Sequence, residues 1–166
     1  MPRLRPVRSA AAAMADFPAE NTYRVLAATI RDVHAIRRLE QVVFPLDAYS
    51  YLSLTTLLMM PGGSNFRAVD ARGSLIGFVA GSPNWGTHID WIVTLGVLPD
   101  HRRHGLGHRL LVVCEEHLTQ PTIRLTVRVS NEAALRLYES ASYRRLYVEP
   151  HYYSDGENGV VMEKRR

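Results

Sequence analysis

The segment PDHRRHGLGHRLL, residues 99–111, gathers cationic and small residues directly before an apolar run. Arg102, Gly105 and Gly107 follow a strand-like segment and precede the apolar pattern of a helix. A helix N-terminus presents unpaired backbone N–H groups and the positive end of the macrodipole. Glycine lets a ligand approach those groups, and arginine pairs with phosphate oxygens. The spacing therefore predicts a turn that binds pyrophosphate.

Two better-known phosphate motifs do not fit this segment. A Walker A loop needs Lys-Ser/Thr after its last glycine, and a dinucleotide fingerprint needs a third glycine. Gly107 is followed by His108 and Arg109 instead. A structural glycine turn with solvated arginines stays open as the alternative. His104 and His108 are four residues apart but have no acidic or cysteine partner nearby, so we expect no metal site.

The elements that must position this turn alternate between strand and helix patterns. Strands are expected over 22–28, 66–71, 74–82, 88–97, 122–129, 143–149 and 159–164. Helices are expected over 33–43, capped by Asp32, over 48–60 and 107–119, and from a cap at Ser130 or Asn131 to about 141. Hairpins and strand–helix–strand units both occur, which predicts an α/β domain on a mixed sheet.

Length and composition indicate one globular domain over 21–166, preceded by a disordered Arg/Ala/Pro-rich tail over 1–20. The formal charge is +4, and Arg3, Arg5 and Arg8 supply three of those charges. Residues 16–166 therefore carry +1 (4 minus 3), which disfavours nucleic acid as a partner. No apolar run approaches the roughly 20 residues needed to span a bilayer. The only cysteine, Cys114, excludes an internal disulfide and favours the cytoplasm.

The chain resembles the GNAT family of N-acetyltransferases. Arg102-x-x-Gly105-x-Gly107 after a strand is similar to the family's first motif. VRVSNEAALRLYES, with Asn131 and Tyr138, is similar to its second. FPLDAY (44–49) and the late HYY (151–153) resemble protein N-terminal and ribosomal-protein alanine acetyltransferases. This resemblance implies a GNAT fold: a mixed, mostly antiparallel sheet of about seven strands flanked by about four helices.

The resemblance also implies acetyl-CoA as cosubstrate and assigns residues to the site. Cofactor contacts are expected from Leu95, Gly96, Val97, Arg102, Arg103, His104, Gly105, Leu106, Gly107, His108 and Asn131. Acceptor contacts are expected from Phe44, Pro45, Leu46, Tyr49, Trp91 and Tyr152. The backbone N–H of Val97 would stabilise the oxyanion. Tyr138 would be the catalytic acid that protonates the leaving thiolate.

The sequence departs from the family where a general base is expected. Thr126 stands where relatives carry Glu or His, and Trp91 replaces a relative's Tyr. Neither side chain is a base near pH 7. Strand alternation places Asp90 on the face opposite Trp91, and His151 or Glu149 stay open through a bridging water. Ser142 replaces a family glycine, so a positive φ there would be strained.

Two classes of function follow. The first is an acetyl-CoA-dependent N-acetyltransferase, acting on a protein or peptide N-terminal α-amine or, alternatively, on a small-molecule amine. The second is a non-catalytic acyl-CoA-binding module, motivated by the missing base. We expect a monomer or homodimer with no nucleic-acid or membrane partner.

Overall fold

The structure, a computed structural model, describes residues 23–166. The tail predicted over 1–20 lies outside these residues. The strands are β1 Arg24–Ala27, β2 Ser64–Val69, β3 Leu75–Ser82, β4 Ile89–Val97, β5 Thr122–Arg128, β6 Arg144–Glu149 and β7 Gly159–Arg165. The α-helices are α1 Val33–Val43, α2 Tyr51–Met59, α3 Leu106–His117 and α4 Glu132–Ser140. Each expected strand and helix is present, with ends shifted by up to a few residues.

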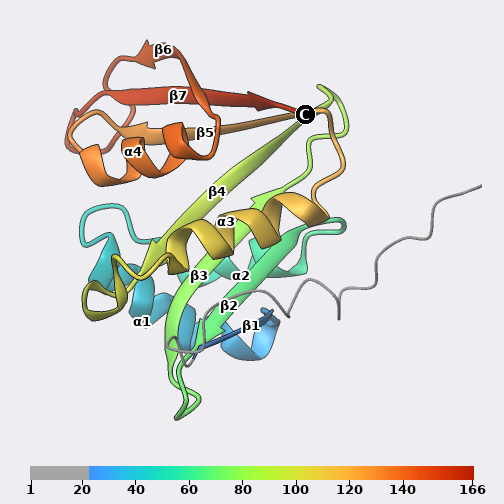
Figure 1. Ribbon diagram of the computed structural model, residues 1–166, viewed down its shortest axis with the longest axis vertical. Helices are drawn as coiled ribbons and strands as arrows, with labels where there is room; N and C mark the ends of the chain where they lie inside the picture. Colours follow the sequence, from blue (N-terminus) through green and yellow to red (C-terminus); the bar gives the residue numbers. More distant parts are fainter. Residues whose placement is uncertain (1–22) are drawn as a thin grey trace, which may run out of the picture.

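The strands form one sheet in the order β1-β2-β3-β4-β5-β7-β6 (Figure 1). Every neighbouring pair is antiparallel except β4 and β5, which are parallel and joined through α3. A parallel pair needs such a crossover, whereas antiparallel neighbours can be joined by short turns. This arrangement confirms the predicted fold class.

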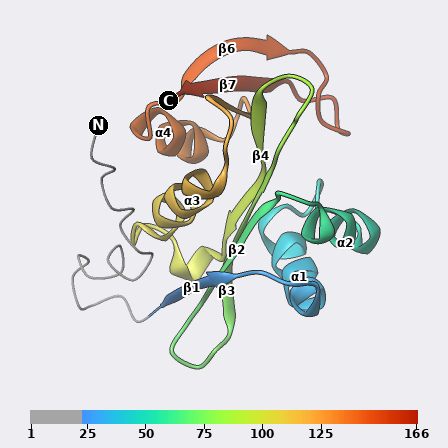
Figure 2. The same cartoon turned by 90° about the vertical axis from the view of Figure 1, so that its right-hand side faces the viewer.

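Helices cover both faces of the sheet (Figure 2). On one face, α3 and α4 pack over a core that includes Leu110, Leu111 and Ile123. On the other face, α1 and α2 pack over a smaller core around Ile36 and Phe78. Within residues 23–166, no helix combines the length and apolarity that crossing a membrane requires.

Local sequence explains where α1 and α4 begin. The Asn131 side chain accepts a hydrogen bond from the backbone N–H of Ala134 at 3.2 Å, so Asn131 rather than Ser130 caps α4. The prediction that Asp32 caps α1 with its side chain is wrong. Its carboxylate accepts from the N–H of Thr29 at 2.8 Å and pairs with Arg67 at 2.9 Å, which stabilises the turn before α1 instead.

Candidate active site

The site begins where β4 and β5 separate. Their ladder consists of three pairs and ends at Trp91 and Arg124. Beyond that point β4 continues beside β3, and β5 continues beside β7, so the two strands diverge (Figure 1). The divergence leaves one edge of the second half of β4 facing a wedge in the sheet.

The backbone of β4 presents polar groups to this wedge. Leu98, directly after β4, donates its N–H to the carbonyl of Ile76 in β3 at 2.9 Å. Backbone groups of successive strand residues point in opposite directions, so those of Val97 and Leu95 point away from β3. The guanidinium of Arg102 confirms the direction for Val97, because its Nε donates to the Val97 carbonyl at 3.0 Å. The backbone groups of Leu95 and Val97 thus face the wedge, where the cosubstrate is predicted to bind.

The N-terminus of α3 lies at the open end of the wedge. Gly105 precedes the helix with φ of 75°, and Arg103 has φ of 64°. A Cβ added at Gly107 would lie 3.5 Å from Leu137 of α4 and 3.9 Å from Val97 of β4, which is ordinary contact. The protein itself would therefore accept a larger residue at Gly107, and the glycine suits the approach of a ligand.

Six of the residues predicted for the cofactor fall into three groups. Arg102, Arg103, His104 and His108 are exposed around the turn, as a phosphate-binding role requires. Leu106 is buried and anchors α3 in the core. Asn131 caps α4, and its contact with cofactor stays a prediction. Exposed cations at a helix N-terminus fit a pyrophosphate group.

A pocket of about 590 Å³ lies on the face opposite α3. Three residues predicted for the acceptor, Tyr49, Trp91 and Tyr152, meet there although they come from three separate segments. The other lining residues are Ser82, Pro83, Asn84, Trp85, Gly86, Val93 and Thr126. The structure thus brings the two predicted acceptor loops together around one cavity.

The other three predicted acceptor residues do not line this pocket. The Phe44 ring packs toward Gly96 of β4, where an added Cβ would lie 3.2 Å from the ring. Pro45 and Leu46 are exposed on the same loop. Contacts of these residues with an acceptor stay a prediction.

The described pocket lining contains no carboxylate, imidazole or amine. Asp90 is fully buried on the other face, where its carboxylate accepts from the N–H groups of Thr119 and Gln120, each at 2.8 Å. His151 is exposed, and its Nδ1 lies 3.1 Å from the Gly156 carbonyl. Thr126 and Trp91 both line the pocket, and neither is a base near pH 7. The expectation that no side-chain base removes the proton from the amine stays a prediction.

Sequence reasoning missed Glu40, a carboxyl buried directly behind the pocket. Glu40 is 1% exposed, accepts from the Thr94 hydroxyl at 2.7 Å and from the Tyr49 N–H at 3.4 Å. Burial raises the pKa of this carboxyl above its ordinary value. A glutamate next to Leu39 on the apolar side of a predicted helix was the available signal. Glu40 holds the Tyr49 backbone and does not itself line the pocket.

Tyr138 lies on the buried side of α4, with 7% of its surface exposed. Its ring packs edge-on against Tyr143 at 5.7 Å between centroids. Burial raises the pKa of Tyr138 well above its ordinary value of 10.0, so the phenol keeps its proton. A protonated phenol is the form that a general acid requires.

Ser142 does adopt the left-handed backbone expected of the family glycine, with φ of 72°. The turn is therefore retained. A non-glycine residue in this region costs of order 1 kcal/mol.

Among the described residues, no group of three or more His, Cys, Asp or Glu side chains is arranged to hold a metal ion. Cys114 is buried, and its thiol donates to the Ser64 carbonyl at 3.3 Å. Burial raises the pKa of this thiol to about 12. A thiol in this state packs in the core and does not act as a nucleophile.

Known proteins match most of the chain. The model of the acetyltransferase (GNAT) family matches residues 30–143. An uncharacterized N-acetyltransferase of Methanocaldococcus jannaschii is 31% identical over 82% of this chain and 87% of its own length. An N-alpha-acetyltransferase of Sulfolobus acidocaldarius is 29% identical over 84% of this chain and 90% of its own length.

A solved structure agrees with these relatives. The ribosomal-protein-S18-alanine N-acetyltransferase from Escherichia coli is 25% identical and has a TM-score of 0.75. The similarity covers 86% of this chain and 93% of that chain.

Proposed function

This chain belongs to the acetyltransferase (GNAT) family, and we propose that it acetylates the α-amine of a protein or peptide N-terminus. The chain is an acyltransferase, and acetyl-CoA is its cosubstrate. The family resemblance drawn from the sequence is confirmed. The relatives named N-alpha-acetyltransferase support the choice of acceptor.

The observation that carries this proposal is the uncharged, aromatic pocket next to the wedge in the sheet. Tyr49, Trp91 and Tyr152 line it, and the described lining has no carboxylate. A site for a polyamine or aminoglycoside would need anionic groups to pair with several cations. A peptide N-terminus brings one amine and an extended backbone, which suits aromatic walls between two loops.

The chemistry balances with the residues present. The neutral amine attacks the thioester carbonyl, the C–N bond forms and the C–S bond then breaks. The nitrogen releases its proton to solvent, and the Tyr138 hydroxyl gives a proton to the leaving thiolate. The Tyr138 phenolate then takes a proton back from solvent, which restores the acid. The Val97 N–H, directed toward the wedge, is the proposed donor to the oxyanion. The products are an N-acetyl amide and the thiol form of CoA.

The pocket's lack of a side-chain base is compatible with this acceptor. An α-amine has an ordinary pKa near 8, whereas a lysine amine has one near 10.4. A substantial fraction of α-amine is therefore already neutral at pH 7 to 8. A site without a base thus selects α-amines over lysine side chains by their chemistry.

The test is mass spectrometry after incubation with acetyl-CoA. The acceptors are peptides with a free α-amine and varied first residues, the same peptides with a blocked N-terminus and an internal lysine, spermidine, and an aminoglycoside. We expect acetylation of the α-amine alone, in a subset of the peptides. Gly107→Glu places a carboxylate at the phosphate site and serves as the inactive control.

Other outcomes would replace the proposal. Acetylation of spermidine or the aminoglycoside alone would assign the enzyme to small amines. Acetyl-CoA binding with no product from any acceptor would favour the non-catalytic binding module, which the substitutions at Thr126 and Trp91 motivate.

The proposal also places the chain in the cytoplasm, because its only cysteine is a buried free thiol.

A further inference from the structure

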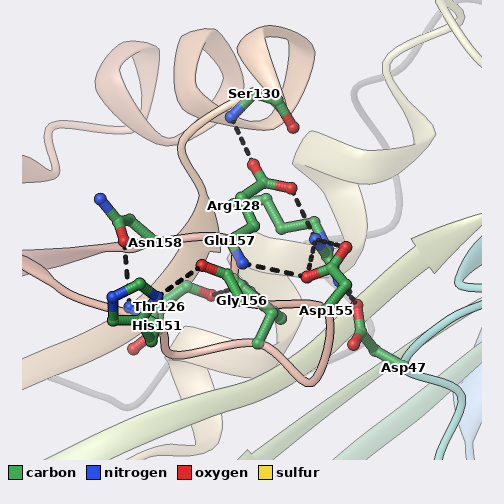
Figure 3. Close-up of polar contacts among 10 residues, drawn as sticks. Asp47, Thr126, Arg128, Ser130, His151, Asp155, Gly156, Glu157 and Asn158 are labelled. Carbon is green, nitrogen blue, oxygen red and sulfur yellow. Dashed lines mark hydrogen bonds and ion pairs between the residues drawn. The ribbon is translucent and has the colours of Figure 1, made fainter.

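Arg128, at the end of β5, joins the two loops that flank the pocket (Figure 3). We call residues 44–50, between α1 and α2, and residues 150–158, between β6 and β7, the acceptor loops. The Nε of Arg128 donates to Asp47 of the first loop at 2.9 Å, and Nη2 donates to the same oxygen. Its Nη1 donates to Asp155 at 2.9 Å and also to Glu157, both in the second loop. One guanidinium thus contacts three carboxylates from two segments far apart in the sequence.

The second acceptor loop is also tied to the strand that carries Arg128. Glu157 accepts from the backbone N–H of Ser130 at 2.9 Å, and Val129 donates its N–H to the Asn158 carbonyl at 3.2 Å. Figure 3 shows the bond between Ser130 and Glu157, together with the nearby contacts of His151 with Gly156 and Asn158. The first loop has no corresponding bond to β5 among the described contacts except through Arg128 and Asp47.

The guanidinium also packs on an aromatic ring of the second loop. Its central carbon lies 4.1 Å from the centroid of the Tyr153 ring, within the range of a cation–π contact. Tyr153 packs edge-on against Tyr152 at 5.0 Å between centroids. Tyr152 lines the pocket, and Tyr49 lies two residues after Asp47. The contacts of Arg128 therefore reach Tyr152 through the Tyr153 ring, and on the other wall they hold Asp47, which is separated from Tyr49 by one residue.

The position of Arg128 suits a clamp more than a surface ion pair. Its side chain is 16% exposed, and Asp47 and Glu157 are 25% and 24% exposed. A planar guanidinium presents several donors in a fixed fork, which fixes its partners in direction as well as distance. Strand alternation also puts Arg128 on the same face of β5 as Thr126, which lines the pocket.

We propose that Arg128 is a positioning residue for the acceptor: by clamping the two acceptor loops together, it fixes the separation of Tyr49 and Tyr152 across the pocket. The inference rests on the proposed function, because it assigns the pocket to the acceptor. Acetyl-CoA binding involves the wedge and the N-terminus of α3, so the clamp acts on acceptor binding and orientation and leaves the cosubstrate site unchanged.

The experiment compares Arg128→Gln, Arg128→Lys and Asp47→Asn with the wild-type full chain. The matched control is Arg145→Gln, because Arg145 is an exposed arginine on β6 paired with Glu139 at 2.9 Å. A displacement of about 1 Å in a positioning group can cost roughly 100-fold in rate. We expect Arg128→Gln to lower kcat/KM for the best peptide by about that factor, mainly through KM. The Kd for acetyl-CoA should stay unchanged, and Arg145→Gln should behave as wild type.

The conservative variants separate clamping from charge. Lysine keeps the charge but loses the fork, so Arg128→Lys should recover only part of the peptide affinity. Asn keeps an acceptor oxygen at position 47, so Asp47→Asn should fold and show a smaller rise in KM. The two residues act on one contact. The double variant Arg128→Gln/Asp47→Asn should therefore lower kcat/KM for the peptide by less than the product of the two single factors. The proposal is overturned if the double variant loses the full product of the two single losses in kcat/KM. It is also overturned if the peptide KM is unchanged in both single variants.

A second readout keeps failure of the clamp distinct from failure of the proposed function. Hydrogen exchange is measured on the two acceptor loops without any acceptor. Faster exchange in both loops of Arg128→Gln, and not in Arg145→Gln, supports the clamp even if no peptide proves to be a substrate. Unchanged exchange in both loops overturns it whatever the activity.

Discussion

At the scale of single residues, Tyr138 is the side chain whose chemistry the proposed reaction uses directly. We expect Tyr138→Phe to lower kcat by about 100-fold or more, since a general acid typically contributes at least that much. The Kd for acetyl-CoA should change little, because Phe retains the ring packed against Tyr143. Steady-state kinetics and calorimetric binding measure the two quantities separately. An unchanged kcat would remove Tyr138 from the mechanism.

The pH dependence of the wild type provides a control on the same residue. Because burial raises the pKa of Tyr138 above 10.0, the acid stays protonated across the working range. The acceptor amine loses its proton near pH 8. The kcat/KM for a peptide should therefore rise through pH 8 and show no loss before about pH 10. A fall between pH 8 and 10 would contradict this assignment.

Glu40 leads to a prediction about stability. Its carboxyl has a raised pKa in the folded chain, so it binds its proton more tightly there than in the unfolded chain. This contribution to the free energy of unfolding is fully present below the unfolded-state pKa of about 4.5, and it is lost as pH rises through the folded-state pKa. Gln cannot ionise. We therefore expect Glu40→Gln to gain stability relative to wild type as pH rises from about 4.5 to 7.5.

Urea unfolding of both proteins across this pH range measures that difference. The absolute offset between them also contains the altered hydrogen bond to the Tyr49 N–H, so the informative quantity is the slope of the difference with pH. A difference that stays constant over the range would show that Glu40 ionises as readily in the fold as in the unfolded chain.

At the scale of elements, we interpret the glycines at the start of α3 as serving a ligand rather than the fold. Gly107 lies within the first turn of the helix, and an added Cβ would make only ordinary contacts with Leu137 and Val97. We expect Gly107→Ala to raise the free energy of unfolding by up to about 1 kcal/mol. We also expect it to weaken acetyl-CoA binding by about tenfold, or about 1.4 kcal/mol. Chemical denaturation measures the change in stability, and calorimetry measures the change in acetyl-CoA affinity. If Gly107→Ala lost stability but kept its affinity, the glycine would serve the fold rather than the ligand.

The elements themselves could be predicted from the sequence because each carries a strong local signal. Leu106, Leu110, Leu111 and Cys114 repeat at helical spacing and are all buried in α3. Ile123, Leu125 and Val127 alternate along β5 and are buried on one face. Such periodicities are local, so they need no knowledge of the partner element. The ion pair of Asp32 with Arg67 was not predictable in this way, because Arg67 comes from β2, although the bond of Asp32 to the Thr29 N–H is local.

The candidate site shows the same difference between local signals and long-range contacts. Tyr49, Trp91 and Tyr152 could be proposed from motifs, and the structure places them around one pocket. Glu40 and Arg128 could not, because their roles depend on contacts 54 and 81 residues away along the chain. A sequence pattern can indicate on which face of a helix or strand a residue lies. It does not indicate which distant side chain that residue contacts.

At the scale of the whole molecule, the sheet consists of two parts joined by a short parallel ladder. Strands β1 to β4 form one part, β5 to β7 the other, and three residue pairs connect β4 with β5. The wedge proposed for the cosubstrate and the pocket proposed for the acceptor both lie where these parts diverge. The contacts of Arg128 with Asp47 add a second connection between the parts, on the acceptor side. Binding in the wedge should therefore stabilise the molecule as a whole.

This arrangement predicts how acetyl-CoA affects stability. At 100 times its Kd, a ligand that binds only the folded state adds about 2.7 kcal/mol. For a domain of this size that corresponds to a rise in Tm of roughly 5–10 °C. Gly107→Glu should show no such rise, because its carboxylate repels the phosphates. A similar rise in that variant would mean that acetyl-CoA binds elsewhere.

Hydrogen exchange along β4 would locate the stabilisation, because neighbouring amides in this strand face opposite sides. The amides of Leu95 and Val97 point toward the wedge, whereas those of Gly96 and Leu98 point toward β3, where Leu98 bonds Ile76. Acetyl-CoA should slow exchange at Leu95 and Val97 well beyond the slowing at Gly96 and Leu98. Uniform slowing at all four amides would instead show that the cosubstrate stabilises the fold without bonding to this strand, and the pairing proposed for the wedge would be wrong.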